Sequence, residues 1–432
     1  MDEPIPNCHV VAMSYPGRGH INPMLNLCQL LLNCRPDVVV SFIVTQEWLG
    51  FLSGWTPPSN FSFHTIPNVI PSEIGRAKDF HGFYEAALTK MEAPVEELLD
   101  RLELPKPSVI IYDTYLCWVV GMGNRRNIPV ASFYTMSATV FSIFHHFDLL
   151  LLNHHFDSHM NFSEEEKKQL VSYIPGVPPM RIADLPTPIY GKGREVLPRA
   201  LEAVALIAKA QYLLFTSVYE LEAQVVDYLK QKLPLKIYSL GLAIPHPNIE
   251  NSSPGKMEYM KWLDAQPLGS VLYISQGSFL SVSDAQLDEI IAGVRASCVR
   301  FLWVSRGEAD RIQENGNNNG IVVPWCDQLK VLCHRSVGGF WSHCGWNSTK
   351  EGAYAGLPML TFPIFWDQVS NSRLIVDEWK IGLRVKKDDE SLVTAEEIAR
   401  LVTRLMDAES DEAKVKKFGK SVRMEGRLWS IF

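Results

Sequence analysis

The chain has 432 residues, of which 47% are hydrophobic, so it is long enough for about two or three domains that each bury a core. Its formal charge is −7 and it has no long cluster of Lys and Arg, which argues against a nucleic-acid groove or a patch for a membrane surface. Small molecules remain as the expected partners.

Neither the start of the chain nor its most apolar stretch predicts a membrane segment. Met1-Asp2-Glu3-Pro4 lacks the basic region of a signal peptide. The stretch 131–152 contains His145, His146 and Asp148, which a spanning helix would bury in lipid.

The eight cysteines form no CxxC pair, which favours a reducing compartment, so we expect a cytoplasmic protein without a disulfide framework. Cys333-His334 and His343-Cys344 raise the alternative of a zinc site, although their spacing matches no usual ligand pattern.

Short apolar runs rich in Val, Ile, Phe and Tyr recur between longer amphipathic segments. They cover residues 9–14, 38–44, 62–66, 108–112, 130–134 and 212–216 in the first half, and 270–275, 300–304, 320–323, 337–340 and 358–362 in the second. Strands that alternate with helices predict a parallel sheet in each half. The Pro-, Asn- and Ser-rich stretch between the halves predicts a linker at 245–258, between an N-terminal domain (1–244) and a C-terminal domain (259–432).

His20 lies where the first predicted strand gives way to a helix that begins near Pro23. A helix N-terminus disfavours the imidazolium, so this His can stay neutral and take a proton as a general base. Asp113 follows the predicted strand 108–112 and can hold His20 in one tautomer. The alternatives are that His20 is a capping or surface residue and that Asp113 caps the next helix.

Two further features of the first half have a functional and a structural interpretation. Gly17-x-Gly19 invites a dinucleotide site and hence an NAD-dependent oxidoreductase, but Asn22 stands where that motif has its third glycine. Phe83, Tyr84, Phe141 and Phe144 can line the binding site of a hydrophobic acceptor or belong to the core.

The segment 325–368 carries most of the chemistry of the second half. Trp325 can stack on a flat base or be a core residue, and Glu351 can accept both hydroxyls of a ribose or lie on a helix surface. The run His343-Cys344-Gly345-Trp346-Asn347-Ser348 follows a strand and precedes a helix, which places backbone amides and polar side chains at an anion site. Ordinary capping by Asn347 or Ser348 is compatible with that role.

This segment resembles, over its whole length, the plant secondary-product glycosyltransferase signature, the donor-binding box of plant UDP-dependent glycosyltransferases. The resemblance implies an α/β fold of the GT-B class, in which two Rossmann-like domains face each other across a cleft, with acceptor binding in the N-terminal domain. It implies that His20 and Asp113 are the catalytic pair. It also implies a donor site, which comprises Trp325 (stacked on uracil), Cys326, Gln328 and Glu351 (uridine), His343, Gly345, Trp346, Asn347 and Ser348 (phosphates and sugar), Asp367 and Gln368 (sugar), Ser278 (phosphate side) and Thr135 (near the transferred sugar).

We therefore expect an inverting, metal-independent enzyme that transfers glucose from UDP-glucose to a hydroxyl or carboxyl of a small lipophilic plant metabolite or hormone. Gln368 in the last position of the box is similar to glucose-using members. No cofactor and no metal are expected, because no Asp-x-Asp motif has a strand-loop context and a helix dipole can stabilise the UDP leaving group. We expect a monomer.

The chain departs from the family in three places. Asp327 stands where Pro is usual and Lys350 where an apolar residue is usual, and 419–432 lacks the long final helix of the family. Asp327 and Lys350 remove no predicted contact, but because of the altered C-terminus the alternative interpretation is a catalytically impaired protein that binds a nucleotide sugar or a small molecule.

Overall fold

The computed structural model describes residues 8–102, 105–156, 162–191, 193–242, 258–277, 282–305, 307–313, 319–385 and 392–407. These residues fall into two compact units, one on each side of a division between residues 245 and 246. Most of the predicted linker, the predicted site residue Ser278 and the predicted short C-terminal segment lie outside the described residues.

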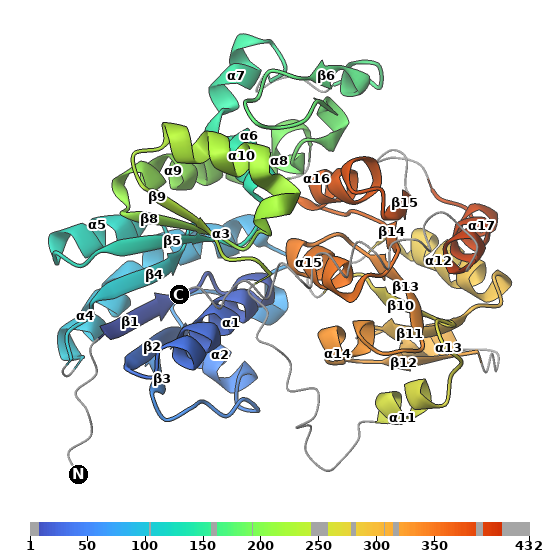
Figure 1. The fold of residues 1–432 in the computed structure, drawn as a ribbon, viewed down its shortest axis with the longest axis horizontal. Helices are drawn as coiled ribbons and strands as arrows, with labels where there is room; N and C mark the ends of the chain where they lie inside the picture. Colours follow the sequence, from blue (N-terminus) through green and yellow to red (C-terminus); the bar gives the residue numbers. More distant parts are fainter. Residues whose placement is uncertain are drawn as a thin grey trace. The chain divides into compact units, whose positions relative to one another are not determined.

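The first unit contains a seven-stranded sheet in the order β3-β2-β1-β4-β5-β8-β9, with every adjacent pair parallel (Figure 1). Its strands are β1 (Cys8–Met13), β2 (Val38–Thr45), β3 (Phe61–Ile66), β4 (Val109–Asp113), β5 (Val130–Tyr134), β8 (Tyr212–Phe215) and β9 (Lys236–Ser239). A separate antiparallel pair joins β6 (Leu170–Val171) to β7 (Met180–Arg181). The central order is that of a dinucleotide-type doubly wound sheet, whose connections reverse direction between β1 and β4.

The helices of the first unit follow its strands in alternation. They are α1 (Arg18–Cys34), α2 (Gln46–Phe51), η1 (Glu73–Gly75), α3 (Phe80–Lys90), α4 (Glu92–Arg101), α5 (Trp118–Arg125), α6 (Ala138–His145), α7 (Phe147–Leu152), η2 (Glu166–Lys168), η3 (Ile182–Asp184), α8 (Thr187–Tyr190), η4 (Arg194–Val196), α9 (Leu197–Leu206), η5 (Ile207–Lys209) and α10 (Tyr219–Lys232).

The second unit has a six-stranded parallel sheet in the order β12-β11-β10-β13-β14-β15. Its strands are β10 (Val271–Ser275), β11 (Arg300–Val304), β12 (Gly320–Val323), β13 (Val337–Ser342), β14 (Met359–Thr361) and β15 (Gly382–Arg384). Its helices are α11 (Glu258–Asp264), α12 (Asp284–Ala296), α13 (Ala309–Gln313), α14 (Gln328–Leu332), α15 (Trp346–Ala355), α16 (Gln368–Arg373), the π-helical η6 (Leu374–Glu378) and α17 (Ala395–Met406). Here the order reverses between β10 and β13.

Alternation along β10 shows how this second sheet is buried on both faces. Leu272 and Ile274 pack with α12 and α17 in one hydrophobic cluster, whereas Val271 and Tyr273 pack with α11, α14 and α15 in another. Successive strand side chains point to opposite faces, so helices must cover both. This explains why the strand reads as a continuous apolar run.

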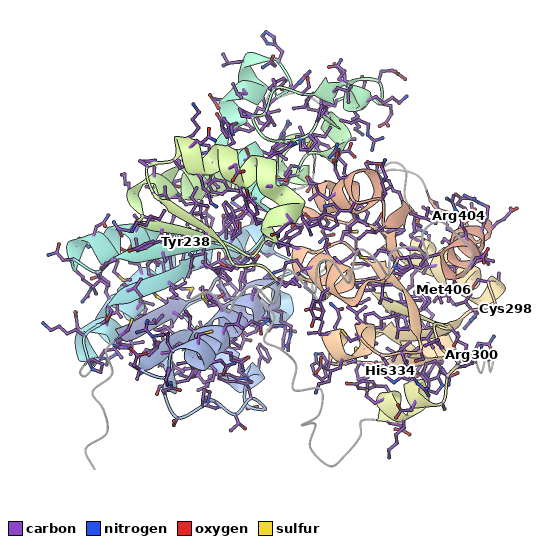
Figure 2. All side chains as sticks on the ribbon, in the orientation of Figure 1. Tyr238, Cys298, Arg300, His334, Arg404 and Met406 are labelled. Carbon is purple, nitrogen blue, oxygen red and sulfur yellow. The ribbon has the colours of Figure 1, made fainter. Side chains whose placement is uncertain are left out.

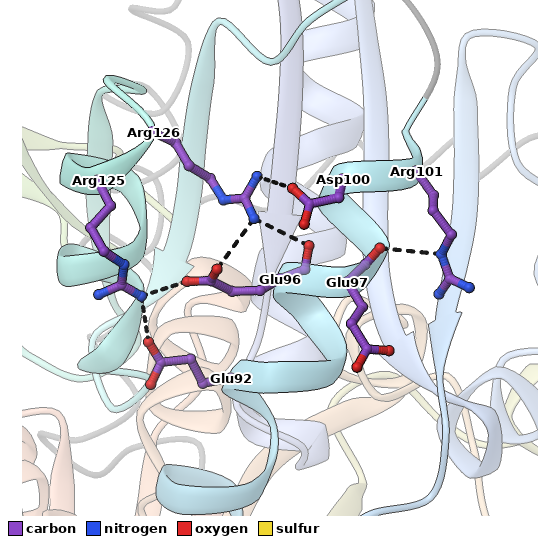
Figure 3. Close-up of polar contacts among 7 residues, drawn as sticks. All are labelled: Glu92, Glu96, Glu97, Asp100, Arg101, Arg125 and Arg126. Carbon is purple, nitrogen blue, oxygen red and sulfur yellow. Dashed lines mark hydrogen bonds and ion pairs between the residues drawn. The ribbon is translucent and has the colours of Figure 1, made fainter.

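Ion pairs connect α4 and α5 in the first unit. Arg125 and Arg126 at the end of α5 contact Glu92, Glu96 and Asp100 on α4, with N–O distances of 2.5 to 3.3 Å (Figure 3). Four of the five side chains are at least 30% exposed, so each pair contributes only about 0–1 kcal/mol.

The predicted parallel sheets are confirmed, and each predicted strand is present with small shifts at its ends. The sequence prediction missed β9, β15 and the β6–β7 pair, which are short. The apolar stretch 131–152 is divided among β5, α6 and α7, and none of the described helices has the length and apolarity that a membrane crossing needs.

Candidate active site

The first cluster of chemically active residues lies at the reversal point of the first sheet. His20 is in the first turn of α1, directly after β1, and Asp113 is the last residue of β4, the strand that pairs with β1. His20 Nδ1 lies 2.7 Å from Asp113 Oδ2. Parallel strands bring their carboxyl ends to one edge, which is why residues so far apart in sequence meet there.

The contact fixes the tautomer of His20. Because Asp113 is 1% exposed and accepts a second bond from the Tyr115 amide at 3.1 Å, we assign the imidazole proton to Nδ1. Nε2 then carries the lone pair, and the His20 side chain is 24% exposed. The arrangement has the features of a general base with an orienting carboxylate.

Thr135 belongs to this cluster as well. Its hydroxyl lies 3.0 Å from His20 Nδ1, just after β5. The helix that follows, α6, is capped by the Ser137 hydroxyl, and buried Glu222 accepts bonds from the Ala138 and Thr139 amides. These hydrogen bonds to Glu222 of α10 fix the start of α6, and so the segment that carries Thr135.

Aromatic rings surround His20 on the first unit. The Tyr15 ring centroid lies 5.0 Å from that of His20, and the Tyr115 centroid lies 6.2 Å away. Phe83 and Tyr84, two of the predicted acceptor residues, are buried against Tyr15 at 6.2 and 5.8 Å. They therefore lie one layer from the base.

The other two predicted acceptor residues belong to the core. Phe141 has 0% exposure, and its ring packs against Tyr134 and Phe215 at 5.2 and 5.3 Å. Phe144 is 2% exposed on the same helix. A single helical run of aromatics does not reveal from the sequence which rings face a ligand, and here the packing of α6 accounts for both.

The second cluster lies at the reversal point of the second sheet, after β10 and β13. The imidazole of His343 lies between two glycines: a Cβ atom at Gly277 would lie 2.8 Å from His343 Nε2, and one at Gly345 would lie 2.5 Å from it. Burial lowers the pKa of His343 to about 4, although a hydrogen bond with the Ser275 backbone acts to raise it. The ring is therefore neutral at physiological pH, and its buried Nδ1 has no partner within the described part of the chain.

The backbone beside His343 is arranged as an anion site. Gly345 is the N-cap of α15 and makes no side-chain cap, so neither Asn347 nor Ser348 caps this helix. The preceding Cys344 has φ of +66°, a conformation that costs a non-glycine residue about 1–3 kcal/mol and is typical of functional turns. Helix N-terminal amides and a buried neutral imidazole suit phosphate oxygens.

The Trp346 side chain is buried in the second unit. It is 4% exposed and packs against Trp379 with ring centroids 6.3 Å apart. The sequence predicts a contact of its side chain with the sugar, whereas the structure places the indole in the packing of the second unit.

A hydrogen-bond network joins the predicted uridine residues. Gln328 Nε2 donates to Glu351 Oε2 at 2.8 Å and to Ser348 Oγ at 3.0 Å. Tyr273 donates to Gln328 Oε1 at 3.1 Å, and its hydroxyl lies 3.4 Å from Cys326 Sγ. These side chains from β10, α14 and α15 therefore converge at one place.

Charge and exposure fit a nucleoside site at this network. Burial raises the pKa of Glu351 to about 7 despite the bond from Gln328, and burial lowers the pKa of the neighbouring Lys350 to about 7. Trp325 is 52% exposed, which excludes the interpretation as a core residue and leaves its face available for stacking.

Asp367 and Gln368 lie at the start of α16. Gln368 Oε1 accepts bonds from the Ile364 and Phe365 amides at 2.8 and 3.0 Å, which leaves its NH₂ group as a donor. Asp367 Oδ2 accepts from Asn371 Nδ2 at 2.7 Å. Trp366, just before Asp367, also has a positive φ, of +60°.

Two residues of this site were missed by the sequence prediction. Tyr273 reads as one apolar residue of a core strand, and no local signal marks its hydroxyl. Asn371 lies one helical turn after Asp367, and that spacing could have indicated the pair.

The zinc alternative finds no support. His334, which is labelled in Figure 2, belongs to the second unit. Its Nδ1 lies 2.8 Å from Ser336 Oγ, and its Nε2 lies 3.3 Å from Asp264 Oδ1. Among the described residues, no group of three or more His, Cys, Asp and Glu side chains could hold a metal ion.

Two doubly wound units, one with a His–Asp pair and one with a buried histidine beside a helix N-terminus, indicate the class of nucleotide-sugar glycosyltransferases. The family model described as UDP-glucoronosyl and UDP-glucosyl transferase matches residues 191–418. UDP-glycosyltransferase 87A2 of Arabidopsis thaliana is 50% identical over 410 residues, which cover 94% of this chain and 89% of that protein. UDP-glycosyltransferase 87A1 of the same plant is 50% identical over 409 residues, 93% and 91% of the two chains.

Solved structures agree on the fold. The structure of Medicago truncatula UGT71G1 matches with a TM-score of 0.80 at 24% identity, over 100% of this chain and 96% of that one. An anthocyanidin 3-O-glucosyltransferase matches with a TM-score of 0.83 at 23% identity, over 98% and 94%. The chain belongs to the plant family 1 UDP-glycosyltransferases, and its fold is GT-B. It is a glycosyltransferase that uses a UDP-sugar.

Proposed function

We propose that the enzyme transfers glucose from UDP-glucose, with inversion and without a metal ion, to a hydroxyl or carboxyl of a small lipophilic plant metabolite or hormone. The contact of 2.7 Å between His20 Nδ1 and Asp113 Oδ2 is the observation that carries the proposal. It supplies a base whose free nitrogen is Nε2.

In the proposed reaction, His20 Nε2 takes the proton of the acceptor hydroxyl as its oxygen attacks the anomeric carbon. The bond between that carbon and the UDP oxygen breaks, and its electron pair leaves with UDP. A single displacement from the opposite face inverts the configuration. Asp113 stabilises the imidazolium that forms, and Thr135 helps to position the ring.

The donor is proposed to bind the second unit. Trp325 stacks on uracil, and Gln328 and Glu351 bind the ribose. His343 and the N-terminus of α15 bind the phosphates and stabilise the negative charge of the departing UDP, which is the function that a metal ion would otherwise serve. Asp367 and the NH₂ group of Gln368 bind the hexose hydroxyls.

The similar proteins support the choice of sugar and acceptor. UGT71G1 was solved with UDP-glucose, and Phytolacca americana UGT2 was solved with UDP-2-fluoro-glucose and pterostilbene, a phenol. Gln368 supports glucose through the family resemblance. We further propose that the enzyme acts as a monomer. We also propose that it acts in the cytoplasm, because its eight free cysteines favour a reducing compartment.

The test is turnover of UDP-glucose with a panel of phenolic acceptors by the wild type and by His20→Ala. We expect β-linked products by mass spectrometry and NMR from the wild type, and a loss of about 10²–10⁴ in kcat for the variant with UDP affinity unchanged. Full activity in the variant would exclude His20 as the base. UDP-galactose in competition tests the sugar, and tight UDP binding without any product would favour the alternative of a non-catalytic binding protein.

A further inference from the structure

We propose that Tyr273 is a positioning residue of the donor site, which acts through the Gln328 amide to hold Glu351 as a hydrogen-bond acceptor for the ribose hydroxyls of UDP. The inference rests on the proposed function, because that function assigns the ribose to Gln328 and Glu351. It adds to that function a buried residue of β10, to which neither the sequence motifs nor the mechanism above gives a role.

The phenol of Tyr273 is held rigidly in the second sheet. Tyr273 lies in the middle of β10, in register with Leu302 of β11 and Phe340 of β13. It is 1% exposed, and its ring stacks on the Phe340 ring with centroids 5.2 Å apart and 29° between the ring planes. Burial raises the pKa of Tyr273 well above its ordinary value of 10, so the phenol keeps its proton. A central strand thus presents one O–H donor in a fixed position.

The Tyr273 hydroxyl and the Glu351 carboxylate together define which way the Gln328 amide points. Tyr273 donates to Gln328 Oε1 at 3.1 Å, and Gln328 Nε2 donates to Glu351 Oε2 at 2.8 Å. A carboxylate only accepts hydrogen bonds, so the amide atom that faces it must be the nitrogen. Because the Tyr273 proton is used at Oε1, the Cys326 thiol, 3.4 Å away, is left to donate to the Tyr273 oxygen. The donors therefore all point one way, from Cys326 to Glu351.

The Gln328 amide has both of its N–H groups bonded within the second unit. One donates to Glu351, and the other donates to Ser348 Oγ at 3.0 Å, so both are bonded to side chains of α15. The amide oxygen has two lone pairs, of which Tyr273 uses one. In this arrangement Gln328 can therefore contact a ribose only as an acceptor, through the second lone pair of Oε1.

Glu351 keeps one oxygen for a ligand, and that oxygen is accessible. The residue is partly exposed, and within the described part of the chain its Oε1 receives no hydrogen bond, yet this oxygen is not one of the buried polar atoms that lack a partner. Glu351 Oε1 is therefore in contact with solvent. Gln328 is partly exposed as well, whereas Tyr273 is buried. A ligand can thus reach the two acceptors, and Tyr273 acts on them from the core.

Two acceptors at one place select a ligand that donates. Each ribose hydroxyl can donate one hydrogen bond, and a bond from a hydroxyl to a carboxylate is charge-assisted and roughly twice as strong as a neutral one. Without the Tyr273 hydroxyl, Gln328 Oε1 loses its donor, the amide is free to rotate, and Glu351 loses the bond that orients it. The affinity that the two ribose hydroxyls contribute should then fall, while the contacts with uracil and the phosphates remain.

The experiment compares UDP with 2′,3′-dideoxy-UDP, which differ only by the two ribose hydroxyls. Titration calorimetry gives Kd for the wild type, Tyr273→Phe and Tyr259→Phe. The last is the matched control, because the buried Tyr259 hydroxyl accepts from the Asp327 amide at 3.1 Å and not from Gln328. We expect the wild type and Tyr259→Phe to prefer UDP by about 10- to 100-fold. For Tyr273→Phe this preference should fall by about threefold to tenfold, with the affinity for 2′,3′-dideoxy-UDP unchanged.

A double variant shows whether Tyr273 acts through the amide. Tyr273→Phe added to Gln328→Met should not lower the preference further, because the amide is already gone, and a further loss there overturns the inference. If Tyr273→Phe keeps the full preference, or weakens both nucleotides equally as a purely structural effect would, the inference alone is overturned and the proposed function stands. If the wild type binds both nucleotides equally, the ribose assignment in the proposed function fails together with the inference.

Discussion

Asn371 and Asp367 are joined by a hydrogen bond of 2.7 Å from Nδ2 to Oδ2. The same Nδ2 donates to the Cys344 carbonyl at 2.9 Å, and Asn371 has 0% exposure. One amide thus links the strained turn before the N-terminus of α15 to the carboxylate proposed to bind the sugar.

We predict that Asn371→Ala weakens donor binding. The substitution leaves Asp367 and the Cys344 carbonyl without this donor, which costs about 1–3 kcal/mol for each buried group. The KM for the UDP-sugar should rise about tenfold or more, measured with acceptor in excess. Asn371→Asp, which places a second carboxylate against Asp367, should be worse than Ala. Equal KM values for all three proteins would contradict a positioning role.

Asp113→Asn tests the orientation of the base. The amide keeps the size of the carboxylate, but it can donate to Nδ1 and so favour the tautomer with the proton on Nε2, which cannot accept a proton from the acceptor. We expect kcat to fall about 10²–10⁴-fold with little change in KM. Thr135→Val is the matched comparison, since it removes the weaker contact of 3.0 Å, and its kcat should fall less. A larger loss for Thr135→Val would assign the orienting role to the hydroxyl.

The sequence was sufficient to predict what depends on local pattern. Apolar runs predicted the parallel strands, and residues placed just after two strands that pair, His20 and Asp113, were predicted to meet. It was not sufficient for contacts that depend on packing between distant elements. Whether Phe141 faces a ligand or the core, and whether Trp346 meets a sugar or Trp379, depends on helices whose positions no local pattern encodes.

The Glu73 and Arg76 pair shows the same limit. The spacing of these residues is compatible with an ordinary surface ion pair across one turn. Only the structure shows that Arg76 is bonded to Pro16 and that Glu73 Oε2 is buried.

His343 predicts a pH dependence of stability. Its pKa of about 4 in the folded protein lies below the ordinary value of 6.5, so between these values the unfolded chain binds a proton that the folded chain does not. Its contribution to the free energy of unfolding is fully present above pH 6.5 and is lost as pH falls toward 4, by at most about 1.4 kcal/mol per pH unit. Because burial raises the pKa of Glu351, that residue acts in the opposite direction, so the difference between wild type and His343→Gln is the informative quantity.

Urea denaturation of the two proteins at several pH values from 4 to 8 measures that difference. It should shrink or reverse as pH falls below 6.5 and be constant above it. A difference that does not vary with pH would mean that His343 is not held neutral by burial. UDP affinity at pH 8 should also be lower for His343→Gln, because the imidazole is proposed to bind a phosphate oxygen.

The burial of Lys350 predicts that replacing it stabilises the folded protein but weakens donor binding. It is 4% exposed, and burial lowers its pKa from 10.5 to about 7, so the unfolded chain binds more protons between these values and the free energy of unfolding rises with pH across that range. Lys350→Met removes a buried charge and should stabilise the protein by about 1–4 kcal/mol at pH 7, with a smaller gain as pH approaches 10.5.

The same substitution should weaken UDP binding at pH 7. The positive charge of Lys350 lowers the pKa of Glu351, so its loss should raise that pKa above 7 and leave the carboxyl mostly protonated. A protonated carboxyl is a poorer acceptor for ribose hydroxyls, and affinity should recover near pH 9. Calorimetric titration of UDP at pH 7 and 9 measures this change in affinity. Glu351→Gln is the control, because without a carboxyl at position 351 the UDP affinity should not vary with pH through that residue. If Lys350→Met binds UDP at pH 7 as tightly as the wild type, the lysine has no such effect on the donor site.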